Sequence, residues 1–199
     1  MSEAARIVGL YERHALAYDA DRSRVLMEQD WLDAFLDLVP PGGPVLDIGC
    51  GMGEPIAAHV LARGHSVTGI DASPTLIGLC RERLPSGDWY VGDMRQLALG
   101  HTFAGLIAWD SFFHLDHDDQ RAMIPRFAAH AAPGAALLFT TGPRPGIAMG
   151  EYRGEPLHHA SLAPDEYRAL LRANGFAVVR HMTEDPTCGG HTVWLARRA

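Results

Sequence analysis

A glycine-rich segment flanked by carboxylates holds the clearest chemical pattern in the chain. Residues 45–55 read VLDIGCGMGEP, an apolar run that passes through Gly49, Gly51 and Gly53 into a helix-like stretch. Glycines let the backbone approach a ligand closely, and the first turn of a helix offers free N–H groups. The segment therefore predicts a ligand site between a strand and a helix, with a purely structural turn as the alternative.

The charges of this turn separate the classes of ligand. A dinucleotide fingerprint has the spacing GxGxxG, whereas here Gly53 comes one residue earlier and is followed by Glu54. A pyrophosphate would meet the carboxylates of Asp47 and Glu54 where it needs N–H donors. S-adenosylmethionine (SAM) instead brings an ammonium and a sulfonium group, and both suit an acidic turn.

Two further carboxylates follow at comparable places. Asp71 ends the second predicted strand, about where a nucleoside-binding βαβ unit places the residue that binds the ribose hydroxyls. Asp93 follows the third predicted strand, where it can accept a hydrogen bond from an adenine amino group while Met94 offers an apolar face to the ring. Three acids at three successive strand ends predict one nucleoside site.

These residues resemble the motifs of class I SAM-dependent methyltransferases, particularly the small-molecule type called methyltransferase domain 11 or 25. The resemblance covers about residues 44–141 and extends to Gly175, Phe176 and the terminal strands. It implies SAM as the cofactor, Asp71 as the ribose-binding acid, and Asp93 with Met94 as the adenine site. The positions that take the family's first motif are Asp47, Gly49, Gly51 and Gly53.

The resemblance also implies where the acceptor lies. Trp109 after the fourth predicted strand would face the methionine end of the cofactor, and Asp110 and Ser111 would border the acceptor. Tyr18 resembles the tyrosine with which many relatives cover the cofactor. His114 lies where relatives build the acceptor pocket, and a histidine with a near-neutral pKa is a natural catalytic base for a hydroxyl or ammonium acceptor. A carboxylate or thiolate acceptor would need no base.

The longest stretch without a predicted helix or strand runs over residues 142–163. Loops of this length in a compact protein are usually either functional or disordered. Tyr11 and Tyr18 share one face of the predicted N-terminal helix, a spacing that core packing explains equally well. We expect the 142–163 segment and this face to close over the acceptor, with Tyr11, Tyr152 and His159 in its pocket.

The remaining pattern predicts the elements that position these residues. Short apolar runs alternate with helix-like stretches between residues 45 and 140, which indicates parallel strands covered on both faces by crossover helices. Strands over 176–182 and 192–196, joined by a turn over 188–191, leave no room for a helix between them. The fold class is therefore α/β, a Rossmann-like seven-stranded sheet with helices on both faces. The family resemblance implies the order 3-2-1-4-5-7-6, with strand 7 antiparallel.

We expect a single domain over residues 1–199 with three parts. Helices over 7–18 and 25–38 form an N-terminal helical cap within residues 1–40. Residues 44–141 form the SAM-binding core. Residues 142–199 supply the acceptor loop, a helix over 164–174 and the terminal pair of strands.

Composition excludes several classes of function. All 17 basic residues are arginines, which rules out Schiff-base chemistry on lysine and the usual P-loop. The formal charge of -7 opposes sequence-independent binding to a phosphate backbone. The three cysteines form no CxxC motif, and no run approaches the roughly 18 apolar residues of a membrane span. We expect a cytoplasmic protein with neither nucleic acid nor membrane as partner.

The sequence thus predicts a SAM-dependent methyltransferase that acts on a small-molecule acceptor by in-line displacement. It contains neither the Asn-Pro-Pro-Tyr signature of amino methylation nor a recognised metal triad, so no metal is expected and the acceptor atom stays open. One alternative is a protein that binds SAM or S-adenosylhomocysteine without transferring a methyl group. Another is a nicotinamide-dependent oxidoreductase. The oligomeric state is not predicted.

Overall fold

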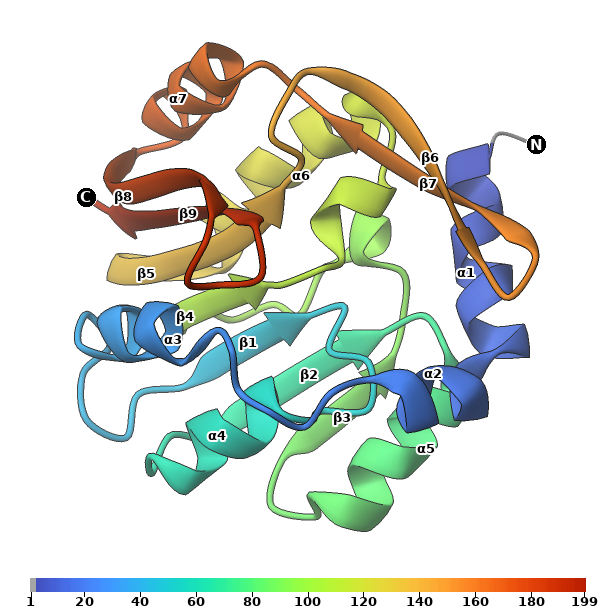
Figure 1. Cartoon of the computed structure of the whole chain (residues 1–199). Coiled ribbons are helices and arrows are strands. Elements are labelled where there is room, and N and C mark those ends of the chain that lie inside the picture. The colour runs from blue at the N-terminus through green and yellow to red at the C-terminus, as the bar shows by residue number, and fades with distance from the viewer. Residues whose placement is uncertain (1–2) are drawn as a thin grey trace.

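A seven-stranded sheet lies at the centre of the computed structural model, which describes residues 3–199 (Figure 1). Its strands are β1 (Val45–Ile48), β2 (Val67–Asp71), β3 (Asp88–Val91), β4 (Phe103–Ala108), β5 (Ala131–Thr141), β8 (Phe176–Asp185) and β9 (His191–Arg198). The spatial order is β3-β2-β1-β4-β5-β9-β8; the first five run parallel, and β9 is antiparallel to both of its neighbours. The predicted order is confirmed, with β8 and β9 as the predicted sixth and seventh strands.

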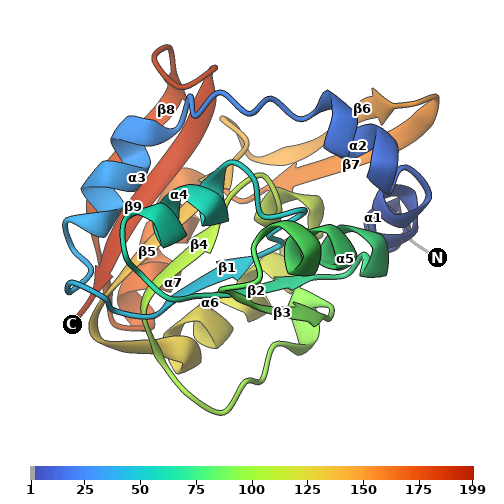
Figure 2. The same ribbon diagram turned by 90° about the horizontal axis from the view of Figure 1, so that it is seen from below.

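Helices cover both faces of this sheet, as predicted (Figure 2). One face packs against α3 (Gln29–Leu36), α4 (Ile56–Ala62) and α5 (Pro74–Arg83), the other against α6 (His117–His130) and α7 (Pro164–Ala173). Successive residues of a strand point to opposite faces, so Leu106 of β4 joins the core under α6 while Ile107 joins the core under α3. No helix within residues 3–199 has both the length and the apolar character needed to cross a membrane.

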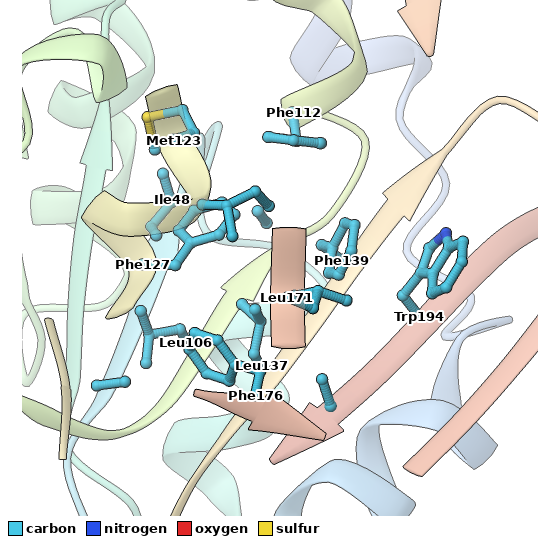
Figure 3. Packing of buried hydrophobic residues seen from close by; sticks show 14 of the residues in the cluster. Ile48, Leu106, Phe112, Met123, Phe127, Leu137, Phe139, Leu171, Phe176 and Trp194 are labelled. Carbon is cyan, nitrogen blue, oxygen red and sulfur yellow. The ribbon is translucent and has the colours of Figure 1, made fainter. Parts of the chain in front are cut away.

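The core under α6 and α7 contains a group of aromatic side chains that includes Phe112, Phe139 and Trp194 (Figure 3). The ring centroid of Phe139 on β5 lies 5.5 Å from Phe112 and 5.9 Å from Trp194, and all three side chains are fully buried. Burying each such side chain stabilises the fold by roughly 1.5–3 kcal/mol. Because Phe112 opens the 3-10 turn η2 (Phe112–His114) after β4, this core fixes the place where His114 emerges.

The N-terminal segment forms two helices instead of one. α1 (Glu3–Arg13) and α2 (Ala15–Asp21) meet at His14, whose φ of -109° and ψ of 16° are not helical. The rings of Tyr11 and Tyr18 nevertheless meet edge to face, with centroids 5.2 Å apart. The face that these two tyrosines share is thus kept across the break.

The 142–163 segment is a β-hairpin, so its interpretation as an irregular loop was wrong. β6 (Gly146–Tyr152) and β7 (Glu155–Ser161) pair antiparallel around Arg153 and Gly154, whose φ angles are 53° and 82°. Two positive φ values fit a type I′ turn, which matches the twist of a hairpin. The pattern was missed because β6 is exposed along nearly its whole length and lacks the alternation of a half-buried strand. Figure 1 shows the hairpin lying against α1.

The predicted turn over residues 188–191 joins β8 to β9. The N–H groups of Cys188 and Gly190 donate to the carbonyl of Asp185 at 3.1 and 2.9 Å. The carboxylate of Asp185 is buried and accepts from the indole of Trp31 on α3 at 2.8 Å. The turn is therefore anchored to the body of the protein, and both strands are longer than predicted.

Candidate active site

Two adjoining cavities open at the carboxyl ends of the central strands, where open α/β sheets bind ligands. The first cavity extends under α1, and its walls include Tyr11, Asp71, Asp93, Met94, Ser111 and His114. The second cavity lies over the glycine turn, and its walls include Arg22, Asp47, Gly53, Glu54 and Trp109. Both cavities share Tyr18, Gly49, Gly51 and Asp110. Of the candidate residues, Tyr152 and His159 line neither cavity.

The glycine turn brings backbone directly to the boundary between the cavities. Gly49 and Gly51 have φ angles of 76° and 56°, which glycine adopts without steric cost. A Cβ atom on Gly49 would lie only 2.3 Å from the Cβ of Ser111, and one on Gly51 would lie 3.5 Å from the ring of Tyr18. The close approach of Ser111 thus requires a glycine at position 49, whereas at position 51 it is the positive φ that favours glycine.

Asp71 is held with both carboxylate oxygens in defined places. Its Oδ2 accepts from the N–H of Gly51 at 2.9 Å, and its Oδ1 accepts from the N–H of Ser73 at 2.9 Å. Burial raises the pKa of this carboxyl above its ordinary value. Asp71 lines the first cavity, and a carboxylate with a free lone pair on each oxygen can accept from two ribose hydroxyls.

Asp47 lies deeper, with 4% of its surface exposed. Burial, with a smaller contribution from the neighbouring charge of Asp71, raises the pKa of its carboxyl to about 7. A cation in the second cavity would offset that cost. The environment of Asp47 therefore fits the ammonium group of a SAM methionine.

Arg22 was missed by sequence reasoning and is the only arginine that lines the second cavity within the described residues. Its Nη2 donates to Oε1 of Glu28 at 2.7 Å, and Glu28 is fully buried. Glu28 is the N-cap of α3, which runs from Gln29 to Leu36 and is therefore shorter than the predicted helix over 25–38. Arg22 and Asp47 together offer opposite charges to the carboxylate and ammonium of one amino acid.

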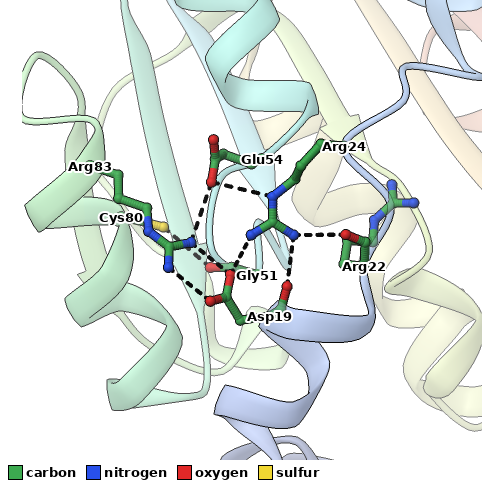
Figure 4. Close-up of polar contacts among 7 residues, drawn as sticks. All are labelled: Asp19, Arg22, Arg24, Gly51, Glu54, Cys80 and Arg83. Atoms are coloured by element: carbon green, nitrogen blue, oxygen red, sulfur yellow. Dashed lines mark hydrogen bonds and ion pairs between the residues drawn. The ribbon is translucent and has the colours of Figure 1, made fainter.

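Figure 4 shows how ion pairs tie α2 to the glycine turn and α5. Asp19 accepts from Arg24 and from Arg83, each at 2.6 Å, and Arg83 also donates to Glu54 at 3.3 Å. The hydrogen bond from Arg83 is the main reason why the pKa of Asp19 falls to about 2. Glu54, expected to act on the ligand, is thus engaged by Arg83 and Arg24. These contacts hold Tyr18 of α2 over the turn.

Asp93 precedes the 3-10 turn η1 (Met94–Gln96) and lines the first cavity beside Met94. Its Oδ1 accepts from both Nε and the backbone N–H of Arg95, at 3.0 and 2.9 Å. Although burial opposes ionisation, these bonds lower the pKa of Asp93. Its Oδ2 also accepts from Arg95, at 3.0 Å from Nε and 2.5 Å from Nη2, so Arg95 holds the carboxylate in its charged form at both oxygens.

His114 is buried and bonded at both ring nitrogens. Its Nδ1 lies 2.8 Å from the carbonyl of His158, and its Nε2 lies 3.0 Å from the hydroxyl of Tyr11. A carbonyl only accepts, so the proton of the neutral ring sits on Nδ1, and Nε2 accepts from Tyr11. Burial lowers the pKa of His114 to about 4, below the near-neutral value expected from the sequence.

Other candidates form a layer behind Tyr11 and His114. The ring of His159 stacks on His114 with centroids 5.0 Å apart, and Tyr152 stacks on Tyr11 at 6.4 Å. Ser111 lies in the first cavity, and its hydroxyl donates to the carbonyl of Ile48 at 2.7 Å. Tyr152 and His159 of the hairpin thus pack behind Tyr11 and His114 without lining the first cavity.

Trp109 and Asp110 lie where β4 ends, on the floor of the second cavity. The ring of Trp109 packs against His191 of the β8–β9 turn, with centroids 5.3 Å apart. His191, which sequence reasoning assigned only to a turn, also reaches the carboxylate of Asp110. Residues 3–199 hold no group of three or more His, Cys, Asp or Glu side chains that could bind a metal ion.

Comparisons with known proteins agree with this arrangement. Residues 45–134 match the family described as Methyltransferase domain. The chain is 30% identical over 101 residues to dTDP-3-amino-3,6-dideoxy-alpha-D-glucopyranose N,N-dimethyltransferase of Streptomyces fradiae, which covers 50% of this chain and 39% of the relative. It is 31% identical over 152 residues to trans-aconitate 2-methyltransferase of Variovorax paradoxus (strain S110), which covers 75% and 51%. The chain therefore spans about half of these relatives' length or less.

Among solved structures, the SAM-bound amino pentose methyltransferase CalS10 from Micromonospora echinaspora shares the fold. Its TM-score is 0.71 at 21% identity, over 94% of this chain and 96% of that one. The family match covers the strands that carry the glycine turn, Asp47, Asp71 and Asp93, and CalS10 is a structure with SAM bound. Residues 45–134 are thus similar to the methyltransferase domain family, and the whole sheet has the fold of a SAM-dependent methyltransferase of known structure.

Proposed function

We propose that this protein transfers the methyl group of SAM to the nitrogen of a small organic amine. The observation that carries this proposal is the direction of the hydrogen bonds around the acceptor end of the first cavity. Tyr11 donates its only O–H to Nε2 of His114, and Ser111 donates its only O–H to the carbonyl of Ile48. Their oxygens are left as acceptors, so they favour a ligand that donates N–H groups.

The charges in the cavities disfavour an anionic acceptor. The arginines that line the two cavities in the described part of the chain are Arg22 and Arg95. Arg95 is already paired with Asp93 at 2.5 Å and with Asp119 at 3.3 Å. A carboxylate acceptor would find no uncommitted cation there and would approach several acids.

The basicity of the site disfavours an alcohol. The pKa of His114 is lowered to about 4 by burial, and its Nε2 is covered by Tyr11. It is therefore too weak a base to activate an aliphatic hydroxyl at neutral pH. An amine in its neutral form brings its own lone pair and needs no base before attack.

The residues of the site orient this attack. When bound, SAM supplies an electrophilic methyl group on its sulfonium. Tyr11 or Ser111 accepts one N–H bond of the amine so that its lone pair points toward the glycine turn, while buried Ile7 and Leu115 help to exclude water. His114 fixes the direction of the Tyr11 hydroxyl and acts through it as a positioning residue.

The relatives give partial support. The names of the Streptomyces fradiae enzyme and of CalS10 describe methylation of amino sugars, whereas trans-aconitate 2-methyltransferase is named for a carboxylic acid. The two alternatives considered from the sequence, ligand binding without transfer and nicotinamide oxidoreduction, gain no support from the comparisons.

We also propose a cytoplasmic protein whose three parts work on a small molecule and not on nucleic acid. The formal charge of -7 and the absence of lysine support this choice. In this division the cap over residues 1–40 covers SAM, residues 44–141 bind it, and residues 142–199 complete the acceptor side.

Two measurements test the proposed function. Calorimetric titration should detect binding of SAM and S-adenosylhomocysteine but not of NAD. Transfer from methyl-labelled SAM should then be followed over matched acceptors, such as cyclohexylamine, cyclohexanol and cyclohexanecarboxylate, and over amino sugars beside their hydroxyl analogues. We expect label in amines only. Binding of NAD in preference to SAM, or label confined to alcohols or carboxylates, would overturn the proposal.

A further inference from the structure

We propose that His191, from the β8–β9 turn, positions the carboxylate of Asp110 to receive the acceptor nitrogen. The inference rests on the proposed function and names the charged pair that would recognise an amine. His191 and Asp110 lie 81 positions apart in the sequence. Neither residue belongs to the glycine turn or to the acids that follow it.

Asp110 stands at the boundary between the two cavities. It is one of the four residues that line both, so its side chain lies where the methionine part and the acceptor part of the site meet. Its φ of 48° is in the left-handed region, which Asp tolerates better than most residues but still at a cost. Its N–H donates to the hydroxyl of Thr140 on β5 at 2.9 Å, which holds this conformation in place.

His191 meets a hydrogen-bond acceptor at each ring nitrogen. Its Nδ1 lies 2.7 Å from the carbonyl of Cys188, and its Nε2 lies 3.1 Å from Oδ2 of Asp110. A neutral imidazole carries one N–H, so satisfying both contacts requires the protonated ring. The geometry therefore describes an imidazolium paired with a carboxylate.

Nε2 of His191 lies 3.0 Å from Oδ1 and 3.1 Å from Oδ2 of Asp110, so both oxygens take part in the ion pair. Oδ1 is buried and, beyond this ion pair, accepts no aligned hydrogen bond among residues 3–199. A buried polar atom without an aligned hydrogen bond is costly, and a ligand N–H at this place would remove the cost. The other carboxylates that line the second cavity are those of Asp47 and Glu54, and both lie at the glycine turn.

The turn that carries His191 is rigid enough to position it. The ring packs against Trp109, and the turn is tied through Asp185 to Trp31 of α3. Trp31 and Asp185 are both buried. Asp110 is thus held by two contacts, one with Thr140 of β5 and one with His191 of the β8–β9 turn.

This placement matches the movement of charge in the reaction. The nitrogen lone pair forms the new N–C bond while the electron pair of the C–S bond returns to sulfur, which becomes a neutral thioether. The positive charge passes to nitrogen, and the product leaves as an ammonium ion with its N–H bonded to Oδ1 of Asp110. A fixed carboxylate stabilises the nitrogen more as its charge develops, so it favours the transition state over the bound amine.

The test uses the amine that the wild type methylates best in the acceptor panel. Asp110→Asn keeps the shape and the left-handed conformation, and His191→Leu removes both ring contacts. We expect each to lower kcat/KM for the amine about 10- to 100-fold, the range for one hydrogen bond to a charged group, with the dissociation constant of SAM changed less than about threefold. His191→Gln, which restores one donor to Asp110, should recover most of the loss.

A double variant separates positioning from packing. If His191 acts through Asp110, then His191→Leu in the Asp110→Asn background should cause little further loss. His101→Leu, on the exposed loop before β4, is the matched control and should behave as wild type. Thermal unfolding identifies variants that fail to fold. If His191→Leu does not fold, the activities of His191→Gln and Asp110→Asn test whether the pair positions the acceptor.

Failure of the inference differs from failure of the proposed function. If the wild type methylates amines but Asp110→Asn retains full kcat/KM, or the losses of the two variants simply add, only the role of the pair is refuted. If the wild type methylates no amine, the proposed function is refuted and the role of the pair with it.

Discussion

The two halves of the site differ in how the chain builds them. In the cofactor half, Asp47 lies in β1, Asp71 ends β2 and Asp93 follows β3. Parallel strands place their carboxyl ends along one edge, so chain order alone brings these acids together. In the acceptor half, Tyr11 comes from α1 and His114 from η2, and only tertiary packing brings them within 3.0 Å. The first half is specified locally and the second by the whole fold.

The halves also differ in charge. Burial raises the pKa of Asp47 and Asp71, whereas it lowers the pKa of His114. The cofactor half concentrates carboxylates that destabilise the protein until a cation binds, and the centre of the acceptor half stays neutral. We therefore expect substitutions in the first half to change binding and stability, and substitutions in the second to change turnover.

Asp47→Asn should give the largest effect. The folded state raises the pKa of this carboxyl from 3.8 to about 7, so ionising it in the folded state costs free energy. The cost is absent below about pH 4 and grows as the pH rises toward 7. At pH 8 the variant should be more stable than the wild type by about 2–4 kcal/mol, judged from that shift. Near pH 4 the two should be equally stable.

Urea unfolding at pH 4 and pH 8 measures this difference, and Asp118→Asn on the exposed start of α6 is the control. The same variant should bind SAM more weakly at pH 8, because it lacks the charge that faces the ammonium. A stability gain confined to pH 4 would contradict the assignment of Asp47 as a buried, strained acid.

Asp71→Ala should have the next largest effect, on SAM affinity. Loss of hydrogen bonds to a charged group costs about 1.5–3 kcal/mol, which corresponds to roughly a tenfold to a few-hundredfold higher dissociation constant. Calorimetric titration measures it, with Asp88→Ala at the exposed start of β3 as the control. A folded variant with unchanged affinity would show that Asp71 does not bind the ribose.

Tyr11→Phe tests the acceptor half. The variant keeps the ring but loses the hydroxyl that His114 orients, so kcat/KM for an amine should fall about 3- to 10-fold, as for one neutral hydrogen bond. The SAM dissociation constant should stay within about twofold, unlike that of Asp71→Ala. Tyr90→Phe on β3, where the side chain is exposed, is the control. Equal losses in SAM affinity and turnover would remove the distinction between the halves.

The same distinction explains what the sequence could predict. The glycine turn and its three acids follow from local spacing, whereas the sheet order was implied by the family resemblance, and the structure has that order. Arg22, His191 and the partner of His114 could not be predicted, because each acts through contacts made across the fold: Arg22 with buried Glu28, His191 with Asp110. The near-neutral pKa expected for His114 ignored burial, which only packing reveals.

The β6–β7 hairpin marks the limit of local reasoning. Residues 142–163 were expected to close over the acceptor, yet Tyr152 and His159 lie behind the cavity walls. What makes the segment a hairpin is its packing against α1 and the turn at Arg153 and Gly154. We therefore predict that the hairpin supports α1. A substitution that weakens this support should have the smallest effect of the variants.

Glu155→Gln should loosen this support slightly. Glu155 accepts hydrogen bonds from Arg13 and from His14, the latter at 2.7 Å, and it thereby links β7 to the helical cap. Exposed ion pairs contribute little, so amide exchange over residues 146–161 should rise only about two- to fivefold. A second link remains, because Asp21 accepts from Tyr152 at 2.9 Å and from Arg153 at 2.7 Å.

Removing both links should therefore have more than an additive effect. In Asp21→Asn with Glu155→Gln, exchange in the hairpin should exceed the product of the two single effects, since either link alone keeps the hairpin on the cap. kcat/KM for the amine should fall modestly, as Tyr11 loses its backing, while SAM affinity stays near wild type. Asp118→Asn again serves as the exposed control. If exchange over 146–161 is unchanged in the double variant, packing of β7 on α1 holds the hairpin without the ion pairs, and the cap and the acceptor half are joined by apolar contact alone.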